Sequence, residues 1–132
     1  MNPDVSIIIV SYNTGDVIAA CLDSLLSDRK YSTEILVVDN ASSDGSVKLI
    51  KNNYSSVNLI TNTENSGFAA ANNQALKLYR GNYVLFLNPD TVVKSGFIER
   101  ALEFMETHPK IGLAGTKIVD QKGLIRETIA IF

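Results

Sequence analysis

The segment VSIIIV, residues 5–10, decides the fold class of this chain because it is a short run dominated by β-branched side chains. A run that is apolar at successive positions, and not only at alternate ones, is typical of a strand covered on both faces, as in a parallel sheet. The apolar residues over 17–26 then change to helical spacing. A buried strand followed by an amphipathic helix is the repeating unit of an α/β fold.

The same alternation continues along the chain. Further strands are predicted at 35–38, 57–61 and 83–87, further helices at 47–54, 68–79 and 97–105, and a hairpin from strands at 111–119 and 124–132 around a turn at 120–123. We expect a mostly parallel sheet with helices on both faces, because crossovers between parallel strands are nearly always right-handed. Such sheets bind ligands beyond the carboxyl ends of their strands, where the strand order reverses.

The composition is that of one ordinary globular domain. The 132 residues carry 12 basic and 14 acidic side chains, a formal net charge of −2, with 45% hydrophobic and 20% charged residues. Nucleic-acid binders usually carry a basic face, so nucleic acid is not an expected partner. We expect no transmembrane segment and no signal peptide, because no apolar run approaches roughly 18 residues. The single cysteine suits a cytoplasmic protein.

Polar residues follow the predicted strands on what should be one rim of the sheet. They are Ser11, Tyr12, Asn13, Asp39, Asn40, Asn72, Asn73, Asn88 and Asp90. The segment 40–45 could simply turn the chain and cap the next helix, and that alternative stays open. For Asp39 and Asp90 we favour function, since each carboxylate comes at the end of an apolar strand, facing the predicted crevice.

The sequence contains neither of two common phosphate-binding motifs. There is no Gly-x-Gly-x-x-Gly after a strand and no Gly-x-x-x-x-Gly-Lys-Ser/Thr, so a dinucleotide-binding fold or a P-loop is not expected. The segment NPDTV, residues 88–92, is similar to the Asp-x-Asp motif of haloacid-dehalogenase-type phosphatases. Its first position is Asn88, however, and an amide cannot form an aspartyl-phosphate.

Taken in order, the strand-end segments resemble family 2 glycosyltransferases, the inverting sugar transferases of the GT-A fold. The matching segments are SIIIVSYN at 6–13, VVDNASSDGS at 37–46, NSGFAAANN at 65–73, LFLNPD at 85–90 and GLAG at 112–115. Each is degenerate alone, but together they follow the family order over nearly the whole chain. The variants after Asp39, at 67–69 and at 88–90 are most similar to the rhamnosyltransferase-like branch, which often uses dTDP-rhamnose.

The resemblance implies a UDP- or dTDP-sugar donor and gives the rim residues their roles. Asp39 would accept a hydrogen bond from the imide N–H of the base, and Tyr12 would pack on the base. Asp90 would hold Mg²⁺ or Mn²⁺. The other positions that would contact the nucleotide or donor are Ser11, Asn13, Asn40, Asn72, Asn73 and Asn88.

The chemistry of the leaving group also favours a divalent ion. Negative charge builds on the departing diphosphate and needs cationic stabilisation. The strand-end motifs contain no Lys or Arg, whereas a hard cation that bridges phosphate and protein oxygens would serve. Many relatives have an acidic residue at position 88 and an arginine at position 72. Asn88 offers only a neutral carbonyl and Asn72 no positive charge, so diphosphate binding should differ in detail here.

An inverting transfer also needs a general base that deprotonates the acceptor hydroxyl. The resemblance places this carboxylate well downstream of the metal motif. We do not expect Asp120 or Glu127 to serve, so the base is expected beyond Phe132. Residues 1–132 would then be a single N-terminal nucleotide-sugar-binding portion that lacks the acceptor-binding half and is inactive alone.

Two classes of function remain open. The first is a glycosyltransferase that uses a glycan or lipid-linked acceptor in polysaccharide or cell-envelope synthesis, in the cytoplasm or at the inner face of the membrane. The second is a non-catalytic nucleotide-binding module of the same fold. In either class, exposed strands could pair with a second copy to form a homo-oligomer.

Overall fold

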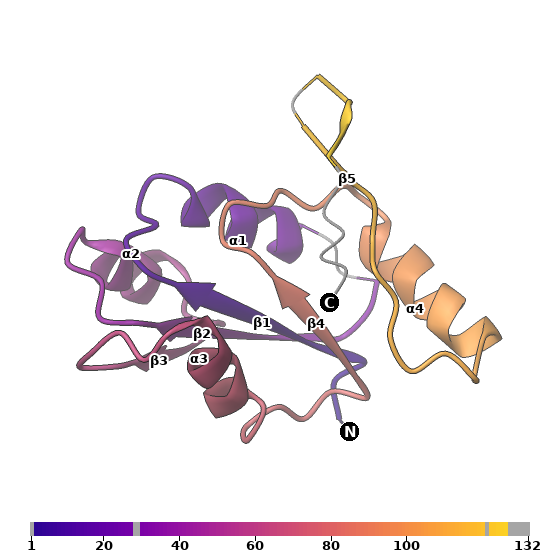
Figure 1. The fold of residues 1–132 in the computed structure, drawn as a ribbon, viewed down its shortest axis with the longest axis horizontal. Helices are drawn as coiled ribbons and strands as arrows, with labels where there is room; N and C mark the ends of the chain where they lie inside the picture. The colour runs from indigo at the N-terminus through magenta and orange to yellow at the C-terminus, as the bar shows by residue number, and fades with distance from the viewer. Residues whose placement is uncertain (1, 28–29, 121, 127–132) are drawn as a thin grey trace. The chain divides into compact units, whose positions relative to one another are not determined.

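The computed structural model describes residues 2–27, 30–120 and 122–126. At its centre is a sheet of four parallel strands in the order β3-β2-β1-β4 (Figure 1). The strands are β1 (Val5–Ser11), β2 (Thr33–Asp39), β3 (Asn58–Thr61) and β4 (Tyr83–Leu87), and between them in sequence lie the helices α1 (Ile18–Leu26), α2 (Ser46–Asn53) and α3 (Phe68–Ala75). The mostly parallel α/β sheet predicted from the sequence is confirmed.

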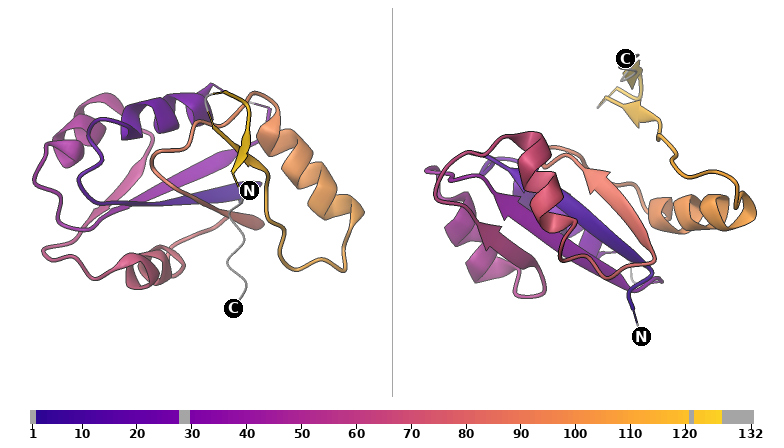
Figure 2. Two further views of the ribbon diagram at one scale, coloured as in Figure 1. Left: turned by 45° about the horizontal axis from the view of Figure 1, so that its top comes forward. Right: turned by 60° about the horizontal axis from the view of Figure 1, so that its bottom comes forward.

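The strand order reverses at β1. From β1 the chain moves to β2 and β3 on one side, and it then returns to place β4 on the other side of β1. Because the crossovers are right-handed, the reversal moves the connecting helix to the opposite face of the sheet. Figure 2 shows this result, with α3 on the face opposite α1 and α2. The carboxyl ends of β1 and β4 therefore form a switch point, where such sheets bind ligands.

Two apolar cores lie on the two faces of the sheet, because successive side chains of a strand point to opposite sides. Ile7 of β1 packs in the larger core with Leu22 of α1 and Ile50 of α2. Its neighbour Ile8 packs in the smaller core with Ala71 of α3. The need to fill both cores from one strand explains why residues 5–10 are apolar at nearly every position.

The chain divides into two compact units, Met1–Leu102 and Glu103–Phe132. The helix α4 (Phe97–Thr107) begins in the first unit, where Ile98 and Leu102 join the larger core. Every residue predicted to bind donor or metal lies in this first unit. In the described part of the chain, no helix combines the length and apolarity needed to cross a membrane.

The hairpin of the second unit is shorter than predicted. β5 (Ile118–Val119) pairs antiparallel with β6 (Ile125–Arg126), and residues 111–117 form no strand. The prediction of a strand over 111–119 was wrong for most of that range. Leu113 is 86% exposed, and the two glycines of this segment favour irregular backbone over a strand. Most of the predicted return strand, residues 127–132, lies outside the described residues.

The turn that follows α3 also departs from the prediction of a helix to residue 79. Two i→i+3 hydrogen bonds tighten the backbone after Ala75: Lys77 N–H donates to the Gln74 carbonyl at 3.3 Å, and Leu78 N–H to the Ala75 carbonyl at 2.9 Å. The chain then turns to reach the amino ends of β1 and β2.

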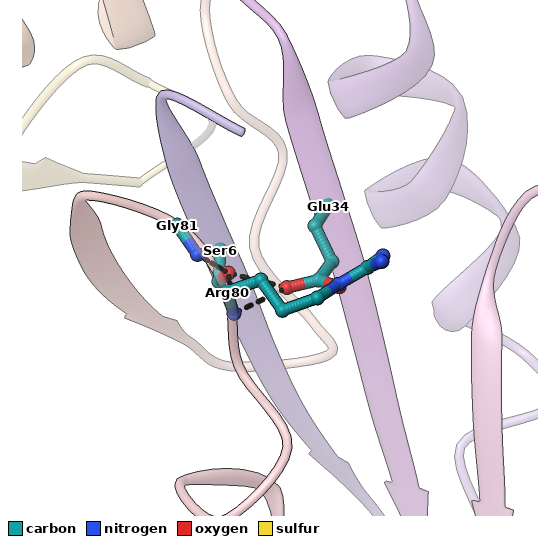
Figure 3. Close-up of polar contacts among 4 residues, drawn as sticks. All are labelled: Ser6, Glu34, Arg80 and Gly81. Atoms are coloured by element: carbon teal, nitrogen blue, oxygen red, sulfur yellow. Dashed lines mark hydrogen bonds and ion pairs between the residues drawn. The ribbon is translucent and has the colours of Figure 1, made fainter. Parts of the chain in front are cut away.

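A cluster of four residues anchors this turn at the amino edge of the sheet (Figure 3). We call Ser6, Glu34, Arg80 and Gly81 the amino-edge cluster. The buried Glu34 carboxylate accepts hydrogen bonds from the Ser6 hydroxyl at 2.6 Å, the Arg80 backbone N–H at 2.9 Å and Arg80 Nε at 2.7 Å. Gly81 N–H donates to Ser6 Oγ at 2.8 Å. A Cβ on Gly81 would stand 2.4 Å from the Ser6 backbone nitrogen, so this approach requires glycine.

The hydrogen bonds of the amino-edge cluster also control the ionisation of Glu34. Burial raises the pKa of Glu34, but the hydrogen bonds from Ser6 and Arg80 outweigh it, and the pKa lies below its ordinary value. The carboxylate is therefore charged in the folded protein, and its charge is matched by the Arg80 guanidinium at 2.7 Å.

Candidate functional site

Asp39 ends β2 at the carboxyl edge of the sheet, in register with Ser11, the last residue of β1. The aspartate is buried, with 1% of its surface exposed. Its Oδ1 accepts hydrogen bonds from the Ser42 hydroxyl at 2.5 Å and the Ser11 hydroxyl at 3.3 Å, and its Oδ2 accepts one from the Ser42 backbone N–H at 2.8 Å. A carboxylate oxygen has two acceptor directions, so Oδ2 can accept one more donor. The two serines thus orient the Asp39 carboxylate and leave one acceptor direction of Oδ2 unused.

Asn13 joins the loop after β1 to the loop after β2. Its backbone N–H donates to Ser42 Oγ at 2.8 Å, and its side-chain carbonyl accepts from Ser43 N–H at 2.9 Å. Asn13 has φ of 52° and Ala41 has φ of 65°, both in the left-handed region that non-glycine residues rarely adopt. Such backbone persists where neighbouring contacts hold it, and it is common at binding loops. Ser42 therefore links Asn13 to Asp39 through one hydroxyl.

Asp44 adds a second connection between the same two loops. Its Oδ2 accepts a hydrogen bond from Gly15 N–H at 2.8 Å, and its Oδ1 accepts one from Ser46 N–H at 3.0 Å at the start of α2. Ser46 Oγ in turn accepts from Thr14 N–H at 3.1 Å. The bond from the Ser46 hydroxyl, followed by those from the Gly15 and Ser46 N–H groups, lowers the pKa of Asp44. Asp44 thus takes the turn-and-cap role that the sequence left open.

Tyr12 lies between the two fixed residues Ser11 and Asn13. Its side chain is 52% exposed at the carboxyl edge, although tyrosine usually buries much of its ring. This half-exposed ring directly follows Ser11, the register partner of Asp39, and offers a flat apolar surface at the carboxyl edge.

Asn40 is buried and connects the end of β2 to the segment before α3. Its Oδ1 accepts hydrogen bonds from Asn62 Nδ2 at 2.9 Å and Ser66 Oγ at 3.2 Å, and its Nδ2 donates to the Gly67 carbonyl at 3.3 Å. Both acceptor directions of the amide oxygen are used within the protein. Only one N–H of Asn40 can therefore reach a ligand without breaking this network.

The two asparagines of α3 differ in how far a ligand could reach them. Asn72 is 8% exposed, and its Nδ2 donates to the Phe68 carbonyl one turn earlier at 3.0 Å. Asn73 is exposed. Gly67 precedes the helix with φ of 83°, a conformation that glycine adopts without strain.

Asn88 and Asp90 lie on a turn at the carboxyl end of β4. Thr91 N–H donates to the Asn88 carbonyl at 3.2 Å, and Pro89 occupies the second position, where its fixed φ suits such turns. Both Asn88 and Asp90 are exposed. The buried Cys21 thiol of α1 lies 3.8 Å from the Asn88 carbonyl oxygen; burial, together with the charge of Asp90, raises the pKa of Cys21 to about 11. The thiol is therefore protonated and can donate.

The donor set at this turn fits a metal shared with a phosphate ligand and not an all-protein metal site. Within the described residues, no group of three or more His, Cys, Asp or Glu side chains could hold an ion. Asp90 offers an exposed carboxylate and Asn88 an amide carbonyl. Mg²⁺ ordinarily binds through one or two protein carboxylates together with substrate phosphates and water, so these two residues suffice for that mode.

An open groove of about 490 Å³ lies elsewhere on the first unit. It runs along the edge strand β3 and is lined by Glu34, Asn58, Leu78 and Arg80 among others. Glu34 and Arg80 belong to the amino-edge cluster, at the opposite end of β2 from Asp39. The groove is therefore not the predicted donor site.

The structure brings some of the predicted residues into direct contact and leaves others apart. Ser11, Asn13 and Asp39 form one hydrogen-bonded group through Ser42. Asn40 joins this group through its backbone N–H, which donates to the Ser11 carbonyl at 2.8 Å. The remaining predicted positions are at the same edge without hydrogen bonds to that group among the described residues: Tyr12, Asn72, Asn73, Asn88 and Asp90. Ser42 was not among the predicted site residues, although Asp side chains often accept hydrogen bonds from backbone N–H groups a few residues further along their own turn.

Comparison with known proteins assigns the chain to a family. The family described as Glycosyl transferase family 2 matches residues 6–130, so this chain belongs to that family. The poly(ribitol-phosphate) beta-glucosyltransferase of Bacillus spizizenii is 35% identical over 127 residues, which cover 91% of this chain and 20% of that protein. The UDP-Glc:alpha-D-GlcNAc-diphosphoundecaprenol beta-1,3-glucosyltransferase WfaP of Escherichia coli is 38% identical over 104 residues, 78% of this chain and 41% of that protein.

Solved structures support the GT-A fold. The crystal structure of residues 1–349 of S. aureus TarS in complex with UDP superposes with a TM-score of 0.73 at 26% identity, covering 80% of this chain and 33% of that one. A mannosyltransferase from Pyrobaculum calidifontis in complex with GDP-Man and Mn²⁺ superposes with a TM-score of 0.69 at 27% identity. The resemblance to family 2 and the fold class are thus confirmed, while the rhamnosyltransferase-like branch stays a prediction. The chain spans less than half the length of each glucosyltransferase named above.

Proposed function

We propose that this chain is the donor-binding portion of an inverting glycosyltransferase that transfers a sugar from a UDP-sugar to a hydroxyl of a glycan or lipid-linked acceptor in cell-envelope synthesis. The observation that carries the proposal is the Asp39 carboxylate, which two serines hold at the carboxyl end of β2, beside the switch point, with one acceptor direction left. The UDP complex of TarS and the UDP-Glc donor in the name of WfaP support uracil as the base. Thymine has the same imide N–H, so a dTDP-sugar is the alternative donor.

The base would be recognised by residues from two strands. Asp39 accepts the imide N–H through Oδ2, and Tyr12 covers a face of the ring. Ser11 and Asn13 act mainly by fixing these two residues. The buried Asn40 shapes the segment before α3, where Asn72 and the exposed Asn73 are within the helix that faces the donor.

The diphosphate would be bound at the turn that carries Asn88 and Asp90. A divalent ion, Mg²⁺ or Mn²⁺, neutralises the charge that develops on the leaving diphosphate when it is bound there. Asp90 contributes a carboxylate and Asn88 a carbonyl oxygen. The Mn²⁺ in the complex of the Pyrobaculum calidifontis mannosyltransferase supports this metal class.

The acceptor half of the reaction stays a prediction. We expect the general base and the acceptor site outside residues 1–132, in a cytoplasmic protein acting at the inner face of the membrane. The lipid-linked acceptor in the name of WfaP supports that location. The alternative, a non-catalytic nucleotide-binding module, predicts the same nucleotide affinity without product.

Calorimetry with UDP, dTDP and ADP, each in Mn²⁺ and in EDTA, tests the proposal. We expect UDP to bind more tightly than ADP, whose base lacks the imide N–H, and Mn²⁺ to strengthen binding. Absence of heat with both UDP and dTDP would overturn the proposal. A product assay with a lipid-linked acceptor then separates transferase from binding module.

Asp39→Asn gives the sharpest test of the base contact. Loss of the charged acceptor should lower UDP affinity by roughly 3 kcal/mol, about a hundredfold, because a charged hydrogen bond is replaced by an amide. The matched control is Asp16→Asn, which makes the same charge change on an exposed residue of the loop after β1. If Asp39→Asn binds UDP as tightly as the unmodified chain, Asp39 does not read the base.

A further inference from the structure

The turn that carries Asp90 is fastened to α1 at both of its ends. On one side of the turn, the Cys21 thiol approaches the Asn88 carbonyl oxygen at 3.8 Å. On the other side, Ser24 Oγ accepts a hydrogen bond from Val93 N–H at 3.0 Å. Cys21 and Ser24 are three residues apart and therefore lie on one face of the helix. One face of α1 thus contacts the first residue of the Asn88–Thr91 turn and the residue two positions after its end.

The Ser24 hydroxyl is itself oriented. It donates to the Cys21 carbonyl at 2.7 Å, which directs its proton along the helix and leaves a lone pair for the Val93 N–H. Val93 also packs against the larger core. The backbone at the end of the turn is therefore held by both a hydrogen bond and apolar contact.

Asp90 has no such support of its own. Its side chain is exposed, and no hydrogen bond from another described group holds the carboxylate. The direction of an unsupported carboxylate follows from the backbone that carries it. Supporting residues of this kind are what hold ligating groups in a productive geometry.

We propose that Ser24 and Cys21 of α1 are positioning residues that fix the Asn88–Thr91 turn and so place the Asp90 carboxylate for a divalent ion bound with the donor diphosphate. This inference rests on the proposed function. It assigns to a buried helix face a role in the metal dependence of nucleotide binding, separate from recognition of the base by Asp39.

Ser24→Ala tests the inference by calorimetry with UDP in Mn²⁺ and in EDTA. We expect UDP affinity in Mn²⁺ to fall about tenfold and affinity in EDTA to stay within about twofold, because the variant changes only the turn that places Asp90 for the metal ion. Ser24→Thr keeps the hydroxyl and should restore the Mn²⁺ effect. Ser27→Ala is the matched control, since Ser27 Oγ makes the same i−3 bond, to the Ser24 carbonyl at 2.9 Å, without touching the turn.

Amide hydrogen exchange of the free protein gives a second readout that needs neither metal nor nucleotide. Ser24→Ala should accelerate exchange at Val93 N–H at least tenfold, while Ser27→Ala leaves it unchanged. Cys21→Ala, which removes the donor at the other end of the turn, should give the same selective loss of the Mn²⁺ effect and replaces Ser24→Ala if that variant does not fold.

The outcomes separate the two proposals. If the unmodified chain binds UDP and both Ser24→Ala and Cys21→Ala retain the full Mn²⁺ effect, the positioning role is wrong while the proposed function stands. An equal loss of affinity in Mn²⁺ and in EDTA also overturns it, because it shows a general structural effect. If the unmodified chain binds neither UDP nor dTDP, the proposed function and the inference fail together.

Discussion

At each edge of the sheet, a serine of β1 is paired with an acidic residue of β2. At the amino edge, Ser6 of β1 is in register with Glu34 of β2; at the carboxyl edge, Ser11 of β1 is in register with Asp39 of β2. In both pairs the serine hydroxyl donates to the carboxylate, at 2.6 Å for Glu34 and at 3.3 Å for Asp39. Both carboxylates are buried.

The difference between the edges lies in what balances the carboxylate charge. Glu34 is paired with the Arg80 guanidinium and also accepts a backbone N–H. Among the hydrogen bonds and ion pairs of the described residues, Asp39 contacts only serines and has no cation. A buried carboxylate is costly unless it is paired, so one without a counter-ion is a candidate for a functional site. The amino edge is therefore a structural contact, and the difference supports the proposal that the carboxyl edge binds a ligand.

Gly81→Ala should have the largest effect and would break the amino edge. The added Cβ would stand 2.4 Å from the Ser6 backbone, which cannot move without disturbing the sheet. We expect the free energy of unfolding to fall by about 3 kcal/mol or more in urea denaturation, a large part of the roughly 5–15 kcal/mol of a typical domain. Gly112→Ala, at a glycine with nothing within 4 Å of the added atom, should change it by less than about 0.5 kcal/mol. Equal stability of the two variants would contradict the close approach.

Glu34→Gln should have an intermediate effect on stability and none on binding. The variant loses the ion pair with Arg80 and places the amide NH₂ of glutamine against the donor groups of Ser6 and Arg80. We therefore expect a loss of about 2 kcal/mol in unfolding free energy. UDP affinity should stay within about twofold, whereas Asp39→Asn should reduce it. A large loss of UDP affinity in Glu34→Gln would show that the two edges are not independent.

The same variant gives a pH test of the amino edge. The pKa of Glu34 is lowered in the folded protein from an ordinary value of 4.5, so its contribution is fully present above about pH 4.5 and is lost as the pH falls through the folded value. The stability difference between the unmodified chain and Glu34→Gln should therefore be constant near neutrality and shrink in acid. Denaturant curves from pH 7 to pH 3 measure it, and a difference that grows in acid would contradict the lowered pKa.

Tyr12→Ala should have the smallest effect and would sharpen the assignment of the carboxyl edge. Stacking of a base on an aromatic ring contributes about 1–3 kcal/mol, and we expect about 1 kcal/mol, roughly a fivefold loss of UDP affinity, on this exposed loop. Stability should be unchanged, since the ring is half exposed. Tyr79→Ala, at another exposed tyrosine, is the control and should leave UDP affinity unaltered. Equal affinities in all three proteins would remove Tyr12 from the site.

Much of the fold could be predicted because the strands are buried on both faces. The apolar run at 5–10 and the helical spacing that follows it needed no tertiary information, and the bounds of β1 and β4 were predicted to within one residue. The strand at 111–119 failed because an apolar segment forms a strand only beside a partner strand. Leu113 is apolar in sequence but exposed in the structure.

The candidate site could be predicted only as a set of residue types at strand ends. The hydrogen bond from Ser11 to Asp39, and those that tie Asn40 to the segment before α3, depend on contacts between segments far apart in the sequence. Ser24 illustrates the limit most clearly. Its hydrogen bond to Val93 joins residues 69 positions apart, and a serine inside a helix carries no sequence signal for such a role.

The sequence by itself determined the α/β alternation, the family and the rim on which the polar residues gather. These follow from local periodicity and from residues placed at the ends of apolar runs, which are properties of short segments. Only the tertiary structure decided that, of two serine–carboxylate pairs on the same strands, the one at Glu34 has a cation and the one at Asp39 has none among the described residues. The pairing of Glu34 with Arg80, and its absence at Asp39, depend on where the turn after α3 returns to the sheet, and burial then makes the presence or absence of a counter-ion decisive.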